Sequence, residues 1–142
     1  MPPEWIHVTN KILLSIFLSG VIGLEREVRN KMADLRTHIL VGVGSTLVIL
    51  TSLYLYDVFK AEAPSMDPTR IMSGLITGIG FLCAGTIIKT GEHVIGLTTA
   101  ATLWIVSCIG MAVGAGHYSG AIIGTVLVLL VLTLVRYIER LF

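Results

Sequence analysis

The sequence predicts an all-α integral membrane protein, a compact bundle of five transmembrane helices. Of its 142 residues, 54% are hydrophobic and only 13% are charged, and the mean hydropathy is +0.88. Soluble domains carry about 25% charged residues. Apolar runs of about 20 residues, the length that crosses a bilayer as a helix, recur along the chain. We therefore expect a single transmembrane domain over residues 1–142, with no soluble C-terminal domain.

The expected spans follow the apolar runs in order. They are residues 7–25, 37–56, 70–89, 97–116 and 119–138. Tyr54 and Tyr56 close the second span, where aromatic rings suit a membrane interface. Asp67 and Pro68 precede the third span as an N-cap and a first helical residue. The short connection after the fourth span predicts an antiparallel pair of helices at the end of the chain.

The basic residues of the loops predict the orientation, because Lys and Arg collect on the cytoplasmic side of a membrane. Seven fall on one side, namely Arg26, Arg29, Lys31, Arg36, Lys89, Arg136 and Arg140. Three fall on the other side, namely Lys11, Lys60 and Arg70. We therefore expect the N-terminus outside the cell and the C-terminus in the cytoplasm.

A polar cluster is predicted at the cytoplasmic face, where charged residues crowd between positions 25 and 36. Its expected members are Glu25, Arg26, Arg36, Thr37, Thr98 and Thr99. Glu25 lies at the edge of the hydrocarbon, where a carboxylate is costly unless it is paired, and Arg36 or Arg26 could pair with it. Two interpretations stay open: an ion pair that closes the bundle, or a site for a cation or a proton, with Glu25 as the best metal ligand. Arg29 and Lys31 are expected only to set the orientation.

Small residues recur every four positions on several spans. They are Ser15, Ser19 and Gly23, then Gly74 and Gly78, then Gly110 and Gly114, then Gly120 and Gly124. Such spacing lets helix backbones approach closely, and we expect a homodimer through one of these faces. For Gly78, Gly80 and Gly85 an alternative stays open, in which the chain unwinds and exposes its carbonyl groups to an ion.

Ionisable residues are missing from the middle of every predicted span. Coupled pumps and proton relays need such residues at depth, so a self-contained proton-driven transporter is disfavoured. A passive pore lined by Thr77, Thr86, Thr102 and Ser107 stays open. The sequence has no phosphate-binding G-x-x-x-x-G-K-[ST] loop, no G-x-S-x-G elbow and no H-E-x-x-H motif. We expect no enzyme activity, no cofactor and no nucleic-acid partner, and we expect contact with membrane lipid.

Four stretches together resemble the MgtC/SapB family of bacterial inner-membrane proteins. They are GLEREVRNKMADLRTHILVGVGS, DPTRIMSGLITGIGFLCAGTII, VIGLTTAATLW and IGMAVGAGHY, and they extend from about Gly20 to Tyr118. The resemblance also implies that Asp67 and Arg70 belong to a family motif at the outer face of the membrane. The chain departs from the common family pattern at three positions. Many members have Gly where this chain has Asp34 and Cys83, and many have Arg where this chain has Ile95.

The resemblance implies a multi-pass protein of the bacterial plasma (inner) membrane. It implies a role in magnesium homeostasis under magnesium limitation, in acid resistance and in virulence. The expected mode of action is regulation through binding to other membrane proteins, such as the proton-translocating ATP synthase. The alternative is a channel or transporter for Mg²⁺ or H⁺.

Overall fold

The computed structural model describes residues 4–139 and is mainly helical. Its helices are α1 (Glu4–Val28), α2 (Leu35–Phe59), α3 (Thr69–Ala84), α4 (Leu97–Ala115), α5 (Tyr118–Leu130) and α6 (Arg136–Glu139). A π-helical turn, η1 (Val131–Val135), joins α5 to α6. An antiparallel hairpin of β1 (Ile88–Thr90) and β2 (His93–Ile95) lies between α3 and α4.

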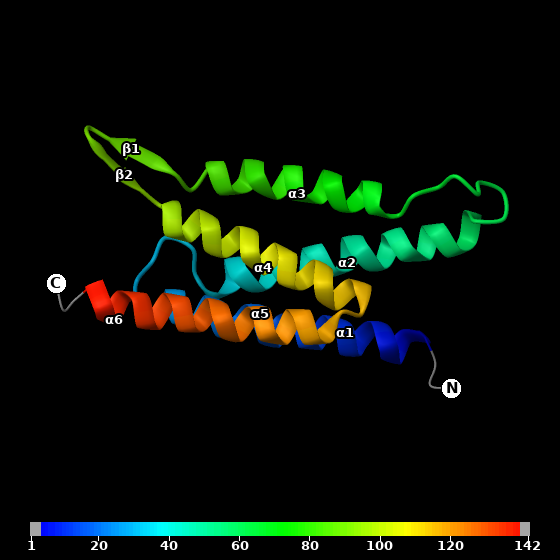
Figure 1. Cartoon of the computed structure of the whole chain (residues 1–142), viewed down its shortest axis with the longest axis horizontal. Helices are drawn as coiled ribbons and strands as arrows, with labels where there is room; N and C mark the ends of the chain where they lie inside the picture. Colours follow the sequence, from blue (N-terminus) through cyan, green and yellow to red (C-terminus); the bar gives the residue numbers. More distant parts are fainter. Residues whose placement is uncertain (1–3, 140–142) are drawn as a thin grey trace.

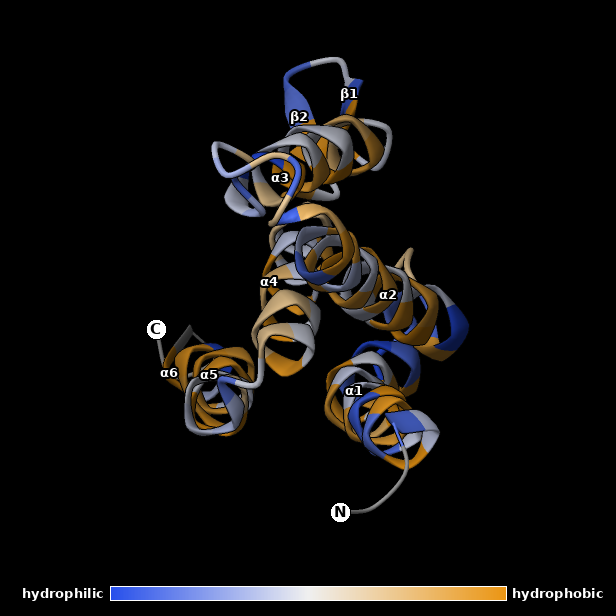
Figure 2. Cartoon of the chain, turned by 90° about the vertical axis from the view of Figure 1, so that its right-hand side faces the viewer, coloured by the Kyte–Doolittle hydropathy of each residue, from blue (hydrophilic) through white to orange (hydrophobic). Residues whose placement is uncertain are grey.

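The helices lie side by side along one long axis, with α4 at the centre (Figure 1). α4 packs against α1, α2, α3 and α5. Seen from the end, α3 lies on one side of α2 and α4, whereas α1 and α5 lie on the other (Figure 2). The buried apolar core forms where α1, α4 and α5 meet, around Ile22, Val106 and Val113.

Four helices are long and apolar enough to cross a membrane: Glu4–Val28, Leu35–Phe59, Leu97–Ala115 and the continuous segment Tyr118–Ile138. α3 is also apolar but has only 16 residues, which is about 24 Å of helix. The predicted third span, 70–89, is wrong at its C-terminal end, because the chain leaves the helix at Gly85 and enters the hairpin. A fifth crossing of the membrane stays a prediction.

The hairpin depends on two glycines that adopt a left-handed backbone, Gly91 at φ +62° and Gly96 at φ +90°. Residues other than glycine rarely adopt this backbone conformation. A Cβ atom at residue 96 would also overlap the carbonyl oxygen of Thr86. Residues 86–89 were therefore mistaken for the end of a span, since composition alone does not show these turns.

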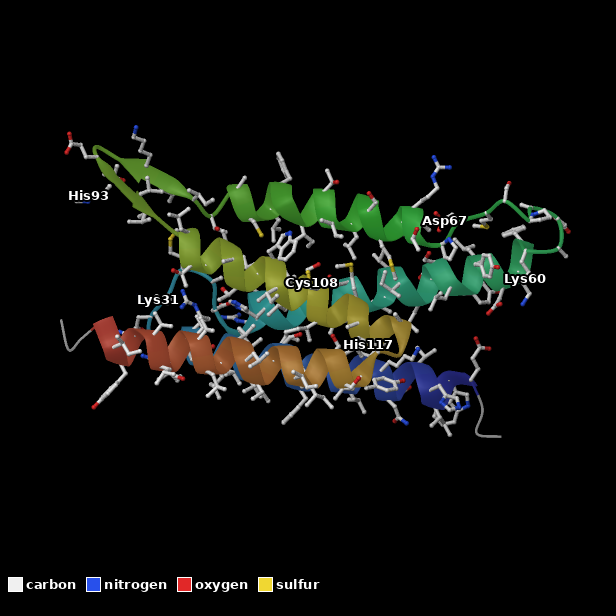
Figure 3. All side chains as sticks on the ribbon, in the orientation of Figure 1. Lys31, Lys60, Asp67, His93, Cys108 and His117 are labelled. Carbon is white, nitrogen blue, oxygen red and sulfur yellow. The ribbon has the colours of Figure 1, made fainter. Side chains whose placement is uncertain are left out.

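The charged loops divide between the two ends of the bundle as predicted. The 29–34 loop, the hairpin and α6 lie at one end, which we call the basic end, and the 60–68 loop lies at the other with the start of α1 (Figure 1). Lys31 and His93 mark the basic end, and Lys60 and Asp67 mark the opposite end (Figure 3). Arg140 lies outside the described residues. Which end faces the cytoplasm stays a prediction.

The predicted close packing through small residues is confirmed for α1 and α4, which both pack on α2, where Gly42 was not predicted. A Cβ atom on Gly42 would overlap the side chain of Ser19, and one on Gly110 would overlap the carbonyl oxygen of Gly42. A Cβ atom on Gly114 would lie 2.8 Å from Cβ of Ile49. These glycines therefore hold α2 between α1 and α4 within one chain.

The remaining small-residue faces make no such contact within the chain. Around Gly74, Gly78 and Gly124 an added Cβ atom would meet nothing within 4 Å, and one on Gly120 would meet only the ring of His117. α3 stays helical through Gly78 and Gly80 and is capped by Gly85. The unwound segment considered for these glycines is therefore not seen.

Candidate functional site

A cavity of about 760 Å³ opens at the basic end of the bundle. Its walls are the last turns of α1 with the loop that follows, the end of β2 with the start of α4, and η1 with Arg136. From the predicted cluster, the lining includes Glu25, Arg26, Thr98 and Thr99. Arg36 and Thr37 lie at the same end but are not part of this lining.

Glu25 is paired within its own helix. Its side chain is 10% exposed, forms an ion pair with Arg29 and lies 4.0 Å from Nη1 of Arg26. The expected pairing with Arg36 is wrong, because that side chain is 90% exposed and lies 3.7 Å from Asp34. The i,i+4 spacing places Arg29 on the same helix face as Glu25. Arg29 therefore belongs to the cluster, although we expected it only to set the orientation.

A chain of polar contacts leads from Arg26 into the bundle. Arg26 is 4% exposed, and its Nη2 donates a hydrogen bond to Oγ1 of Thr99 at 3.3 Å. Oγ1 of Thr102 donates to the carbonyl oxygen of Thr99 at 2.8 Å. The same Oγ1 lies 3.2 Å from Nε2 of His38. Side chains of α1 and α2 are thus joined through the first turns of α4.

His38 is fully buried and links α2 to α4. Its Nδ1 lies 2.8 Å from the carbonyl oxygen of Asp34, which can only accept, so Nδ1 carries a hydrogen. The single hydroxyl hydrogen of Thr102 is donated to the carbonyl oxygen of Thr99, so Nε2–H of the charged ring can donate to Oγ1 of Thr102 while that bond is kept. In the neutral ring Nε2 carries no hydrogen, and it accepts from Thr102 only when the hydroxyl group turns away from Thr99. The sequence analysis missed this residue, because its partner Thr102 lies 64 residues away.

Asp34 caps the first turn of α2. Its Oδ1 accepts hydrogen bonds from the backbone N–H of Thr37 at 2.9 Å and from the hydroxyl group of Thr37 at 2.8 Å. These bonds, with a smaller contribution from the positive charge of Arg36, lower the pKa of the Asp34 carboxyl group. Thr37, a predicted site residue, therefore supports the cap and does not face the cavity.

The substitution Asp34→Asn should lower the melting temperature near neutral pH, and this difference should shrink as the pH falls below about 4. The pKa of Asp34 is lower in the folded chain than in the unfolded chain, where it is about 3.9. The ionised carboxylate therefore stabilises the fold above the unfolded pKa, and this contribution is lost as the pH falls through the folded pKa. Thermal unfolding of both proteins across this pH range measures it. A difference that does not change with pH would contradict the role of the charge.

Hydroxyl groups fill the contact between α1, α2 and α4 in the middle of the bundle. Oγ1 of Thr46 lies 2.9 Å from Oγ of Ser15 and 2.9 Å from the carbonyl oxygen of Gly110. Oγ of Ser45 lies 2.9 Å from Oγ of Ser107. All four hydroxyl side chains are buried. The sequence analysis named Ser107 as a pore residue and Ser15 as a packing residue but missed Ser45 and Thr46, although Ser and Thr on an apolar helix signal such contacts.

The other predicted residues lie away from the cavity. Oδ1 of Asp67 accepts from the backbone N–H of Thr69 at 2.8 Å, at the end opposite the cavity. The predicted cap is wrong by one residue, because Pro68 is the N-cap residue of α3 and Thr69 is the first helical residue. Arg70 follows it there and is exposed. The hydroxyl groups of Thr77 and Thr86 donate to backbone carbonyl oxygens of Ser73 and Cys83. These two threonines therefore do not line a pore within the chain.

The surroundings of Glu25 suit an anion better than a metal ion. Two guanidinium groups flank its carboxylate, whereas Mg²⁺ prefers several oxygen ligands. Within residues 4–139, no three His, Cys, Asp or Glu side chains come together as metal ligands would.

Comparison with known proteins identifies the family. The sequence profile of the MgtC family matches residues 12–141. The chain belongs to the MgtC family. With its spanning helices, it is a multi-pass membrane protein. No solved structure matches the chain.

Relatives occur in several bacteria. The chain is 43% identical over 123 residues to YhiD of Escherichia coli K12, whose name marks it as a candidate magnesium transporter, with 86% of this chain and 57% of YhiD covered. It is 43% identical over 131 residues to the protein MgtC of Brucella abortus, with 92% and 52% covered. An uncharacterised protein of Synechocystis is 37% identical over 126 residues, with 89% and 51% covered. The chain thus spans about half the length of the curated relatives that it matches.

Proposed function

We propose that this chain is a bacterial plasma-membrane protein of adaptation to magnesium limitation or acid stress, and that it acts as a regulator that binds other membrane proteins. The proton-translocating ATP synthase is a candidate partner. The link to magnesium rests on the family and on the name of the relative YhiD. The proposal includes five crossings of the membrane, with α3 as the third, and a cytoplasmic basic end.

The observation that carries the regulatory role is the closed interior. The buried hydroxyl groups of Ser15, Ser45, Thr46 and Ser107 bond to one another and to backbone carbonyl oxygens, whereas that of Ser19 has no partner among the described residues. The glycines bring the backbones of these helices into direct contact. An ion that crossed here would have to break this packing. A conducting path through a single chain is therefore disfavoured over a role in binding.

The alternative, a channel or transporter for Mg²⁺ or H⁺, is favoured by the name of YhiD. Its pathway would combine Glu25 of α1 with the backbone of residues 78–85 in α3. These helices lie on opposite sides of the layer formed by α2 and α4 (Figure 2). The two halves of such a pathway are thus separated by packed helices.

Proteoliposomes that contain the purified chain should show no flux of Mg²⁺ or H⁺ above empty vesicles. Dyes sensitive to Mg²⁺ and to pH inside the vesicles report the flux, and protease accessibility checks the insertion. The variant Glu25→Gln is compared with wild type, and Arg36→Gln, which changes an exposed residue at the same end, is the control. Flux that falls only in Glu25→Gln would replace the regulatory proposal by the transporter. Co-purification of the ATP synthase from membranes with wild type then tests the partner.

A homodimer through α3 is part of the proposal. α3 exposes Gly74, Gly78 and Phe81, whose exposed fraction is 85%, so its small-residue face remains available for a second copy. The variant Gly78→Leu should lower the cross-linked dimer fraction in membranes while the monomer stays folded. Gly124→Leu, at an equally open position of α5, is the matched control. Loss of the dimer in the control alone would move the contact to α5.

A further inference from the structure

The cavity at the basic end carries more positive charge than its walls neutralise. Its described lining holds four basic side chains, Arg26, Arg29, Lys31 and Arg136, and one acidic side chain, Glu25, an excess of three positive charges. The carboxylate of Glu25 forms an ion pair with Arg29 and lies 4.0 Å from Arg26, and its two buried oxygens have no hydrogen-bond partner among the described residues. Like charges gathered in a half-enclosed space raise the local concentration of anions.

Arg26 is the buried member of this group. Its guanidinium group donates to Thr99 through Nη2, but its buried Nε has no hydrogen-bond partner among the described residues. A buried donor left without an acceptor destabilises the fold. An acceptor oxygen in the cavity that Arg26 lines would supply the missing partner.

The start of α4 faces the same cavity without a cap of its own. Gly96 is the N-cap residue, and no side chain accepts from the first backbone N–H groups of the helix. Leu97, Thr98 and Thr99 of this first turn line the cavity. Free N–H groups and the positive end of the helix dipole bind phosphate oxygens. α2 begins at the same end but differs, because Asp34 caps it.

We propose that this cavity binds a phosphate group, carried either by the headgroup of an anionic phospholipid or by a water-soluble phosphate compound. Arginine forks and a helix N-terminus together match the oxygens of a phosphate. Lys31, on the loop after α1, adds a flexible charge at the same end (Figure 3). This inference rests on the cavity alone and does not depend on the regulatory role.

The apolar wall of the cavity gives room for the rest of a ligand. Val131, Leu132 and Val135 of η1 are among its lining residues. A π turn is rare and frequently marks a functional site. Basic pockets between membrane helices bind phospholipid headgroups in this way, with the acyl chains along an apolar helix. The same charges would also hold a soluble phosphate.

The test uses the purified full chain in a neutral detergent with three probes: phosphatidylglycerol, phosphatidylcholine and inorganic phosphate at matched ionic strength. The melting temperature is measured while each probe is titrated, and its dependence on the probe concentration gives an apparent affinity. Phosphatidylglycerol should raise the melting temperature of wild type, and phosphatidylcholine should not. In the double variant Lys31→Gln/Arg136→Gln the affinity should fall about tenfold. The matched control, Arg36→Gln/Lys89→Gln, removes the same charge at the same end from residues outside the lining, and should bind like wild type.

The outcomes separate the two sources of phosphate. Protection by phosphatidylglycerol that the double variant weakens assigns the cavity to a lipid headgroup. Protection by inorganic phosphate alone, weakened in the same variant, assigns it to a soluble compound. No protection by either probe, or an equal loss in the control, would overturn the proposal. If the double variant does not fold, Lys31→Gln alone, in an exposed loop residue, provides the same comparison.

Discussion

Replacing Gly110 by leucine should lower the free energy of unfolding by about 3 kcal/mol, the upper part of the usual range for an overpacked interior. A Cβ atom at residue 110 would overlap the carbonyl oxygen of Gly42 and lie 3.0 Å from Cβ of Ser45. Backbone atoms cannot move aside as a side chain can, so α2 and α4 would have to separate. The hydrogen bond from Thr46 to the Gly110 carbonyl oxygen would be strained as well. Unfolding in mixed detergent micelles, followed by circular dichroism, measures the loss.

Gly124→Leu is the matched control, because the same side chain is added where nothing lies within 4 Å. It should leave the unfolding free energy of the monomer close to that of wild type. Equal stability of Gly110→Leu and wild type would mean that α2 and α4 do not touch in the membrane. The effect expected at Gly110 and Gly114 therefore concerns the fold of one chain, although the sequence suggested these residues equally for a dimer.

The long helices could be predicted from the sequence, because the length of an apolar run is a local property. α1, α2, α4 and the segment from α5 to α6 correspond to runs of apolar residues with charged loops between them. The start of α3 was predictable to within one residue from the local Asp67-Pro68 pattern, although Pro68 is the N-cap residue and Thr69 the first helical residue. Local patterns of this kind need no knowledge of the neighbouring helices.

The partners of the polar residues could not be predicted, because they depend on which helix faces lie together. The contact of Arg26 with Thr99 and that of His38 with Thr102 join different helices and have no local signal, whereas the i,i+4 pair of Glu25 and Arg29 is local and was overlooked in favour of Arg36 and Arg26. The loop between α1 and α2 leaves Arg36 exposed. The hairpin of β1 and β2 was missed for another reason, since its turn depends on two glycines with a left-handed backbone, and its short strands were assigned in part to the end of a span and otherwise to a loop.

The contact of His38 with Thr102 should appear as a coupling of about 1 kcal/mol in a double-mutant cycle of His38→Leu and Thr102→Val. His38→Leu alone should lower the free energy of unfolding by about 2 kcal/mol, since it leaves buried polar groups of Asp34 and Thr102 with fewer partners. Thr102→Val should lower the free energy of unfolding by less than His38→Leu does. The substitution removes the hydroxyl group itself, so no buried hydroxyl donor is left without an acceptor at residue 102. The same unfolding assay in detergent measures all four proteins of the cycle.

A coupling near zero would show that the ring of His38 stabilises the bundle by packing only. His38→Asn and His38→Leu then should be equally unstable. A measurable coupling would instead establish the hydrogen-bonded chain from His38 through Thr102 and Thr99 to Arg26. In that case His38→Leu should also weaken phosphate binding at the cavity, because Thr99 and Arg26 would lose part of their support. Thr125→Val, which removes a buried hydroxyl group of α5 bonded only to its own helix, should leave phosphate binding unchanged.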